Sequence, residues 1–304
     1  MTNGNVYAVD LEKGERLWTG GCATHTGCEQ DTTYVQAYEG VVLTACDKQI
    51  LPGSITWPGN SRICSLNATT GETLWEYQSE KVFWNFYPMF PGDDTFVAQD
   101  CHGGLYRIGV FDGKKRWYVP GVDGSFTDGG AILGPGGTTA YTCSALGHSQ
   151  VEDSGGVMRK YQVSDGKLLW EKRFQQACTS WPAVTADDSL VVVPVGSLPS
   201  PHPAEFSQLK WLPIWFRILV HKFSIWLGDK QQWLWWNPDR KTSIHAFDAK
   251  TGEERWKFED IPPWKQVASK GDEDLWLGSN KTIPWRIICG PAAWGSPAIS
   301  GDGT

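Results

Sequence analysis

The sequence lacks any long apolar run. No stretch reaches the ~18 to 20 consecutive apolar residues of a membrane-spanning helix, so a conventional membrane protein is disfavoured. The first residues, 1–6, contain no basic segment followed by an apolar run, so we expect no secretory signal there. Basic residues are fewer than acidic ones, with 27 Lys and Arg against 34 Asp and Glu, which gives a net charge of −7. This balance argues against a nucleic-acid partner.

Several cofactor motifs are missing as well. The chain contains no C-x-x-C-H run for haem attachment and no G-x-x-x-x-G-K-[ST] loop for nucleotide phosphates. Haem-based electron transfer and NTP hydrolysis therefore lose support.

Tryptophan and turn-forming residues are abundant instead. The 304 residues include 18 Trp, 34 Gly and 18 Pro, and 40% are hydrophobic. Such a chain can bury a substantial core, and the pairing of flat rings with turn formers predicts many short strands.

A thirteen-residue unit recurs five times, at residues 6–18, 63–75, 105–117, 158–170 and 244–256. Each unit ends in Trp, and a Gly precedes that Trp by four positions. The glycines are Gly14, Gly71, Gly113, Gly166 and Gly252, and the tryptophans are Trp18, Trp75, Trp117, Trp170 and Trp256.

Each unit predicts a β-hairpin. Its first arm is apolar on both faces, which is typical of a strand covered on both sides. The Gly supplies the positive φ that the turn needs. A Trp at the same place in every unit is best explained by packing on the neighbouring unit, whereas five unrelated surface tryptophans would be a coincidence.

Further strand-like segments lie between the units, at 33–37 with 41–44, 95–98, 131–133 with 139–142, and 183–184 with 190–193. Two hairpins together give four antiparallel strands. The signature tryptophans are 57, 42, 53 and 86 residues apart, close to the ~40 to 50 residues of a propeller blade except where loops are inserted. The sequence therefore predicts an all-β chain, a β-propeller with about five four-stranded blades in a single domain over 1–304.

The repeat resembles the tryptophan-docking motif AxDxxTGxxxW of the PQQ-like, or quinoprotein alcohol dehydrogenase-like, β-propellers. The pattern is best kept in the first and fifth units, at Ala8, Asp10, Gly14 and Trp18, and at Ala246, Asp248, Thr251, Gly252 and Trp256. The third and fourth units depart from it, with Arg107 and Lys160 at the Ala position and Gly109 and Gln162 at the Asp position. Residues 294–304 resemble the first strand and turn of another blade. The resemblance implies part of a ring of seven or eight blades.

One segment does not look like a blade. We expect an insertion over 199–242 with an amphipathic helix near 214–227, and the apolar character continues over 206–236. The candidate contact residues are Trp211, Trp215, Arg217, Leu219, His221 and Trp226. Such a helix could make a peripheral membrane contact, but we favour a helix packed on the propeller or on a protein partner, because amphipathic character alone does not separate the two surfaces.

The eight cysteines leave several alternatives open. Cys22, His25 and Cys28 form C-x2-H-x2-C, which offers three ligands where structural zinc needs four, so we expect no metal there and favour loop cysteines or a local disulfide. Cys46 and Cys64 could pair in an oxidising compartment. We expect Cys101 and Cys143 to be buried and to pack as small apolar side chains. Two N-glycosylation patterns, at Asn67 and Asn280, add support to a secreted, lumenal or periplasm-like compartment.

Two functions fit the resemblance. In the first, the chain is a non-catalytic scaffold for protein partners with no cofactor, as in members of the family that serve outer-membrane assembly. The alternative is a quinoprotein dehydrogenase that binds PQQ and Ca²⁺ near the axis. The adjacent cysteine pair of many such dehydrogenases is absent, and Asp100, Asp128 and Asp153 cannot be told from solvated loop acids. We therefore assign no catalytic residue and favour the scaffold.

Overall fold

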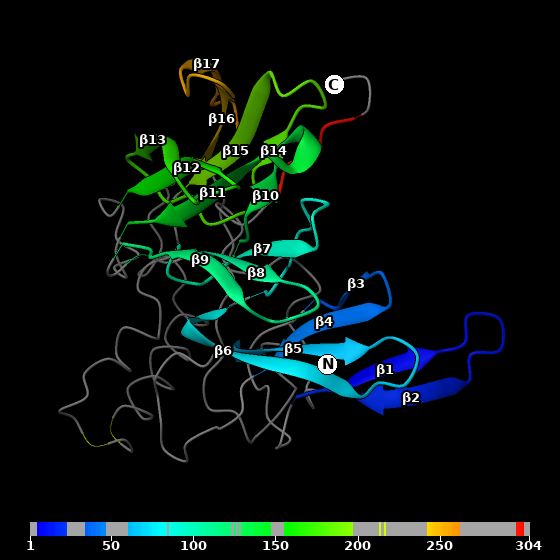
Figure 1. Ribbon diagram of the computed structural model, residues 1–304. Coiled ribbons are helices and arrows are strands. Elements are labelled where there is room, and N and C mark those ends of the chain that lie inside the picture. Colours follow the sequence, from blue (N-terminus) through cyan, green and yellow to red (C-terminus); the bar gives the residue numbers. More distant parts are fainter. Residues whose placement is uncertain are drawn as a thin grey trace.

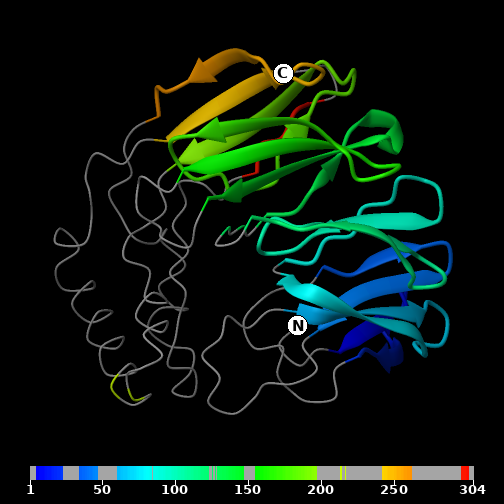
Figure 2. The same cartoon turned by 60° about the vertical axis from the view of Figure 1, so that its left-hand side comes forward.

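The computed structural model describes residues 5–22, 34–46, 60–83, 85–122, 125, 127, 129–146, 155–196, 213, 216, 242–261 and 296–300. These residues form five antiparallel sheets that follow one another in chain order, as Figure 2 shows from the blue first sheet to the orange end of the fifth. Because each sheet takes its strands from one stretch of chain, the sheets are the blades of a propeller.

The first blade has two described strands, β1 (Val6–Val9) and β2 (Arg16–Gly20). The second has β3 (Gln36–Tyr38), β4 (Val41–Cys46), β5 (Asn60–Asn67) and β6 (Thr73–Phe83). The third has β7 (Thr95–Gln99), β8 (Leu105–Gly109) and β9 (Lys115–Val119), with a single bridge from Met89 to Val97 in place of a first strand.

The fourth blade has β10 (Ile132–Leu133), β11 (Thr139–Ala145), β12 (Gly156–Gln162) and β13 (Leu168–Phe174), with a short 3-10 turn at Pro135–Gly137. The fifth has β14 (Ala183–Val184), β15 (Leu190–Gly196), β16 (Thr242–Asp248) and β17 (Glu254–Phe258). In the four-stranded blades the strands lie side by side in sequence order, and Figure 1 labels them. The predicted all-β fold of four-stranded blades is thus confirmed.

All five repeat units keep the same register. The signature Trp is paired with the residue at the Ala position of the preceding strand, as in Ala8 with Trp18 and Ala246 with Trp256. A β-bulge follows directly in every unit. The bulge lets the strand bend into a tight turn.

The turn itself explains the other motif residues. In the first unit the Asp10 carboxylate accepts the backbone N–H groups of Glu12 and Lys13, and the Gly14 N–H donates to the Asp10 carbonyl at 2.9 Å. Gly14 has φ of +69°, a conformation that glycine adopts without strain. Asn67 caps the second turn in the same way, so this residue of the glycosylation pattern has a structural role.

The core lies between the blades. The described residues form four clusters of buried side chains, and each cluster joins two consecutive blades. In one of them, Leu43 and Ile63 of the second blade pack against Phe96 and Ile108 of the third. Every residue of β4 and of β7 is buried, because both faces of these strands are covered by neighbouring sheets.

Candidate functional site

The signature tryptophans join each blade to the next. The indole Nε1 of Trp18 donates to the carbonyl of Ala68 at 2.9 Å, and Trp75 donates to Val110 at 2.8 Å. Trp117 donates to Val163 at 3.0 Å and Trp170 to Ala249 at 3.1 Å. In every case the acceptor is the residue directly after the Asp position in the following unit.

The turn glycines complete these contacts. A Cβ atom on Gly71, Gly113, Gly166 or Gly252 would lie between 2.6 and 3.1 Å from the ring of the preceding blade's Trp. Each ring therefore packs on bare backbone, and a Cβ atom at the glycine would force the ring to shift. We call this arrangement of indole, carbonyl and glycine the Trp–turn dock.

Arg107 and Lys160 strengthen two of the docks. Arg107 donates to the carbonyls of Val163 and Ser164, both at 3.0 Å, and Lys160 donates to the carbonyl of Ala249 at 2.8 Å. Val163 and Ala249 are the same acceptors that Trp117 and Trp170 use. The departures from the repeat pattern in the third and fourth units thus add a charged contact to the next blade.

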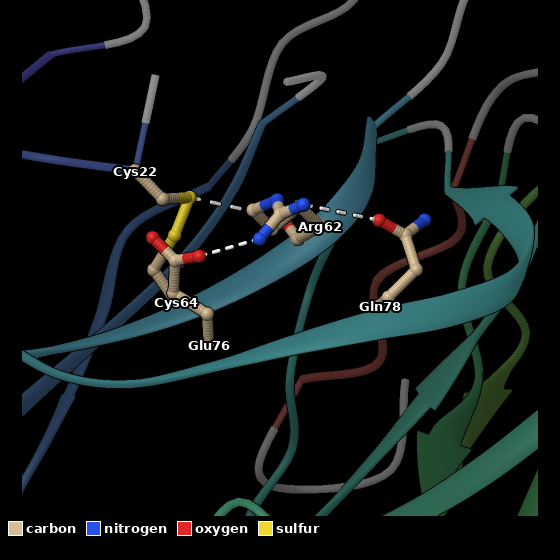
Figure 3. Close-up of a disulfide and its surroundings, with 5 residues drawn as sticks. All are labelled: Cys22, Arg62, Cys64, Glu76 and Gln78. Carbon is tan, nitrogen blue, oxygen red and sulfur yellow. Dashed lines mark hydrogen bonds and ion pairs between the residues drawn. A yellow bond between two sulfur atoms is a disulfide. The ribbon is translucent and has the colours of Figure 1, made fainter. Parts of the chain in front are cut away.

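Two disulfides also connect consecutive blades. Cys22, which follows the first blade's last strand, is bonded to Cys64 in β5, and Cys143 in β11 is bonded to Cys178, which precedes the fifth blade. The Cα atoms are 5.9 and 5.5 Å apart. Figure 3 shows the first disulfide beside Arg62, whose guanidinium contacts Glu76 at 2.5 Å.

These bonds correct two expectations about cysteines. Cys64 pairs with Cys22 and not with Cys46, although Cys46 is itself disulfide-bonded. Cys143 is a disulfide partner and not a small apolar residue, because the entry into the fifth blade brings Cys178 against β11. Cys22 cannot serve as a thiolate ligand of a C-x2-H-x2-C metal site while it is oxidised. His25 and Cys28 lie outside the described residues.

Asp100 is a buried carboxylate in the turn between β7 and β8. Its Oδ1 accepts the backbone N–H groups of His102 and Gly104, both at 2.8 Å, and Tyr118 donates its hydroxyl to Oδ2 at 3.3 Å. Burial raises the pKa of Asp100 to about 6, although these hydrogen bonds oppose the shift. The carboxylate shapes a turn, which is a structural role. Asp128 and Asp153 lie outside the described residues.

Aromatic side chains meet where the blades' first strands begin. Tyr34, Tyr87 and Trp181 each lie two residues before the first paired residue of their blade. The Tyr34 ring contacts the Tyr87 ring edge to face at 5.4 Å and the Trp181 ring at 6.4 Å. Since the second and fifth blades are not neighbours, the contact between Tyr34 and Trp181 crosses the centre of the arrangement.

At the equivalent place the fourth blade has Gly130, where a Cβ would lie 2.6 Å from Trp181 Nε1. The indole thus packs over this glycine. Sequence reasoning missed this axial aromatic cluster of Tyr34, Tyr87 and Trp181, because the three residues share no motif and only the strand register aligns them.

A serine, a histidine and a carboxylate form a chain in the fifth blade. Ser243 Oγ lies 2.8 Å from His245 Nε2, and His245 Nδ1 lies 2.9 Å from Glu254 Oε2. The order is that of a hydrolase relay. However, Ser243 is only 4% exposed, and the imidazole packs on Phe174 of the preceding blade. The serine is closed to substrate, and the network serves blade packing.

The predicted insertion stays a prediction. Of residues 199–242, only Pro213, Phe216 and Thr242 are described, so Trp211, Trp215, Arg217, Leu219, His221, Trp226 and nearly all of the expected helix at 214–227 lie outside the described residues. No helix in the described part of the chain is long and apolar enough to cross a membrane.

Five consecutive blades joined by Trp–turn docks define the class of protein, a β-propeller of PQQ-like repeats. The family model described as outer membrane protein assembly factor BamB matches residues 2–172, which is more than half of the 304 residues. The chain belongs to this family.

Individual relatives agree with this assignment. The outer membrane protein assembly factor BamB of Moranella endobia (strain PCIT) is 24% identical over 173 residues, which cover 57% of this chain and 40% of that protein. The crystal structure of BamB from Moraxella catarrhalis aligns with a TM-score of 0.52 and 14% identity, over 86% of this chain and 56% of that chain.

A europium-containing methanol dehydrogenase aligns with a TM-score of 0.50 and 12% identity, over 77% of this chain and 43% of that chain. Such low identity to a solved structure shows the fold alone. The chain spans about half or less of the length of these relatives.

Proposed function

We propose that this chain is a non-catalytic scaffold that works with protein partners in the assembly of outer-membrane or comparable membrane proteins. The family and the curated relative are both described by that task. The chain corresponds to part of the relative's length, so the proposal concerns the propeller segment that the two share.

The proposal rests on the contacts that the repeat residues make in the structure. Four of the five signature tryptophans and four of the five turn glycines are engaged in contacts between blades. Their spacing therefore has a complete structural explanation, and no part of it calls for catalysis.

The contacts of the described residues favour the scaffold over a site for a quinone with calcium. Such a site needs several hard oxygen ligands together with basic groups near the axis. Within the described ranges no three His, Cys, Asp or Glu side chains come together as metal ligands. The axial cluster presents aromatic rings in edge contact instead, and Arg107 and Lys160 point to the next blade.

The disulfides support an oxidising compartment. Disulfides persist in secreted, periplasmic and lumenal proteins and are rare in reducing cytosol. Since each of the two pairs joins consecutive blades, oxidation contributes to the fold, which suits a protein that assembles outside the cytoplasm.

The function is tested by removing the gene from the organism that encodes it and measuring the amount of folded β-barrel membrane protein by heat-modifiable gel mobility. The scaffold proposal predicts a loss that the intact gene restores. Unchanged levels would contradict it.

A second experiment separates the enzyme alternative. The purified chain is titrated with pyrroloquinoline quinone and Ca²⁺ and assayed for dye-linked alcohol oxidation. Stoichiometric binding with turnover would replace the scaffold by a dehydrogenase, whereas the proposal predicts no turnover at millimolar cofactor.

A further inference from the structure

The hairpin turn of the second blade carries a pattern for covalent modification. Asn67, Ala68 and Thr69 match the N-x-[ST] sequence of N-linked glycosylation. The glycan is attached to the asparagine side-chain nitrogen, Nδ2, and it is bulky and lies at the surface. The pattern is therefore usable only where the folded turn leaves Nδ2 open.

The cap that Asn67 provides uses only one end of its amide group. Oδ1 accepts the backbone N–H groups of Thr69 at 2.8 Å and of Thr70 at 3.1 Å. Within the described residues, both hydrogen bonds of this side chain are made by Oδ1. The cap does not need Nδ2, which lies on the other side of the amide group.

The fifth blade shows what can reach that other side. Asp248 caps the equivalent turn, and its Oδ1 accepts the N–H groups of Lys250 at 3.0 Å and Thr251 at 2.8 Å. Its Oδ2 accepts a hydrogen bond from Arg255 Nη2 at 2.5 Å, and the Arg255 side chain is 56% exposed. The atom equivalent to Asn67 Nδ2 is thus reached by a bulky group from the surface while a signature Trp is docked on the same turn.

In the second blade an apolar side chain replaces that arginine. Leu74 stands at the position of Arg255, directly before the signature Trp, and it is 49% exposed. Leu169 at the same position of the fourth blade is 43% exposed. Both of these blades have a neighbour on each side (Figure 2), so the exposure belongs to this position of the outer strand. Because leucine cannot bond to an amide, it leaves Nδ2 available.

The other two residues of the pattern are also suitably placed. Ala68 packs in the buried cluster between the first and second blades, and its carbonyl accepts the indole N–H of Trp18 at 2.9 Å. Thr69 is exposed and Asn67 is half-buried. The middle residue therefore joins the blades, while the acceptor asparagine and the threonine required by the pattern remain at the surface.

We propose that Asn67 is N-glycosylated, with the glycan on Nδ2 at the surface of the second blade. Nδ2 attacks the anomeric carbon of an oligosaccharide that is linked to a lipid pyrophosphate. A carbon–nitrogen bond forms, the bond from this carbon to the pyrophosphate oxygen breaks, and the lipid pyrophosphate leaves with the electron pair. One Nδ2 proton passes to a base of the transferase, and nothing is oxidised or reduced.

The modification is compatible with the fold. The glycosylated amide keeps its Oδ1, so the turn keeps both hydrogen bonds of the cap. The sugar takes the place of the guanidinium in the fifth blade and covers part of Leu74. The two disulfides indicate the oxidising type of compartment in which secreted and lumenal proteins fold.

The protein isolated from the organism that encodes it provides the first test. Digestion with a peptide N-glycosidase is expected to increase its gel mobility, because the enzyme removes the glycan. The same digestion converts a glycosylated asparagine to aspartate, so peptide mass spectrometry should find Asp at position 67 only after treatment. Unmodified Asn67 in the untreated protein overturns the proposal.

Variants expressed in that organism separate the glycan from the fold. Asn67→Asp restores the carboxylate cap that Asp10 and Asp248 form, so the chain should fold normally yet lose the mobility shift. Thr69→Ala should lose the shift as well, whereas the matched control Thr69→Ser should keep it, because serine preserves the pattern. Asn280→Gln is included in every chain to remove the second pattern. A shift that persists in Asn67→Asp overturns the proposal.

Discussion

Trp170 lies directly over Gly252, so closely that a Cβ atom on Gly252 would fall 2.8 Å from the indole ring. The two residues belong to different blades and are far apart in sequence. The contact shows why the repeat keeps a Trp and a Gly four positions apart: each unit provides the ring for the next unit and the bare turn for the previous one.

Removal of a docked ring should destabilise the propeller strongly. Trp170→Ala is expected to lower the free energy of unfolding by ~3 to 5 kcal/mol, because it leaves a cavity and removes one of the two hydrogen bonds that the Ala249 carbonyl accepts. Trp256→Ala, at the exposed position of the same motif, should cost less than about 1 kcal/mol. Urea unfolding at a concentration where the chain is monomeric measures both. Equal losses would contradict the docking role.

Alanine substitutions at two turn glycines distinguish the free-energy cost of backbone strain from the cost of a clash with the docked ring. Gly14→Ala should cost about 1 to 2 kcal/mol, because alanine disfavours a φ of +69° but meets no described atom. Gly113→Ala should cost about 1 to 3 kcal/mol more, because its Cβ would lie 2.7 Å from the Trp75 ring. Thermal and urea unfolding of the two variants measure the difference in their free energies of unfolding. Equal destabilisation would show that the Trp75 ring moves aside at no cost.

The disulfide between Cys143 and Cys178 should contribute measurably to stability. It spans 35 residues, for which the loss of unfolded-state entropy corresponds to about 3 to 4 kcal/mol. The double substitution to serine should lower the free energy of unfolding by about that amount. Mass spectrometry after alkylation without reductant checks the bond itself. Rapid alkylation of Cys143 in the folded chain would show that the two cysteines are not paired.

Asp100 should make stability depend on pH. Its folded-state pKa of about 6 lies above the ordinary value of 3.8, so the folded state holds the proton more tightly than the unfolded state. Its contribution is therefore most favourable below pH 4 and declines as pH rises through 6. Asp100→Asn removes this titration, so the variant should gain about 2 to 3 kcal/mol relative to the native chain between pH 4 and pH 7. Parallel pH profiles in urea unfolding would contradict this.

Much of the fold could be predicted because each repeat carries its own geometry. The Asp that caps the turn, the Gly with positive φ and the Trp that packs on the next unit all lie within thirteen residues. Local spacing therefore predicts blades, and the strands between units follow from apolar periodicity.

The rest depends on contacts that local spacing does not contain. Spacing suggests that Cys64 could pair with Cys46 across one connection, yet it is bonded to Cys22 of the previous blade. Tyr34 and Trp181 meet only because the blades turn around a centre. Arg107 and Lys160 looked like divergence, since nothing in the sequence shows that a long cation reaches the same carbonyl as the tryptophan.

The placement of the disulfides between blades has a consequence for proteolysis. Cys143 and Cys178 lie on either side of the fourth blade's outer hairpin. A single cut anywhere between them would leave two pieces that are still covalently joined, so the nicked protein would migrate as one band until it is reduced. The chain can thus survive a broken peptide bond in an environment rich in proteases.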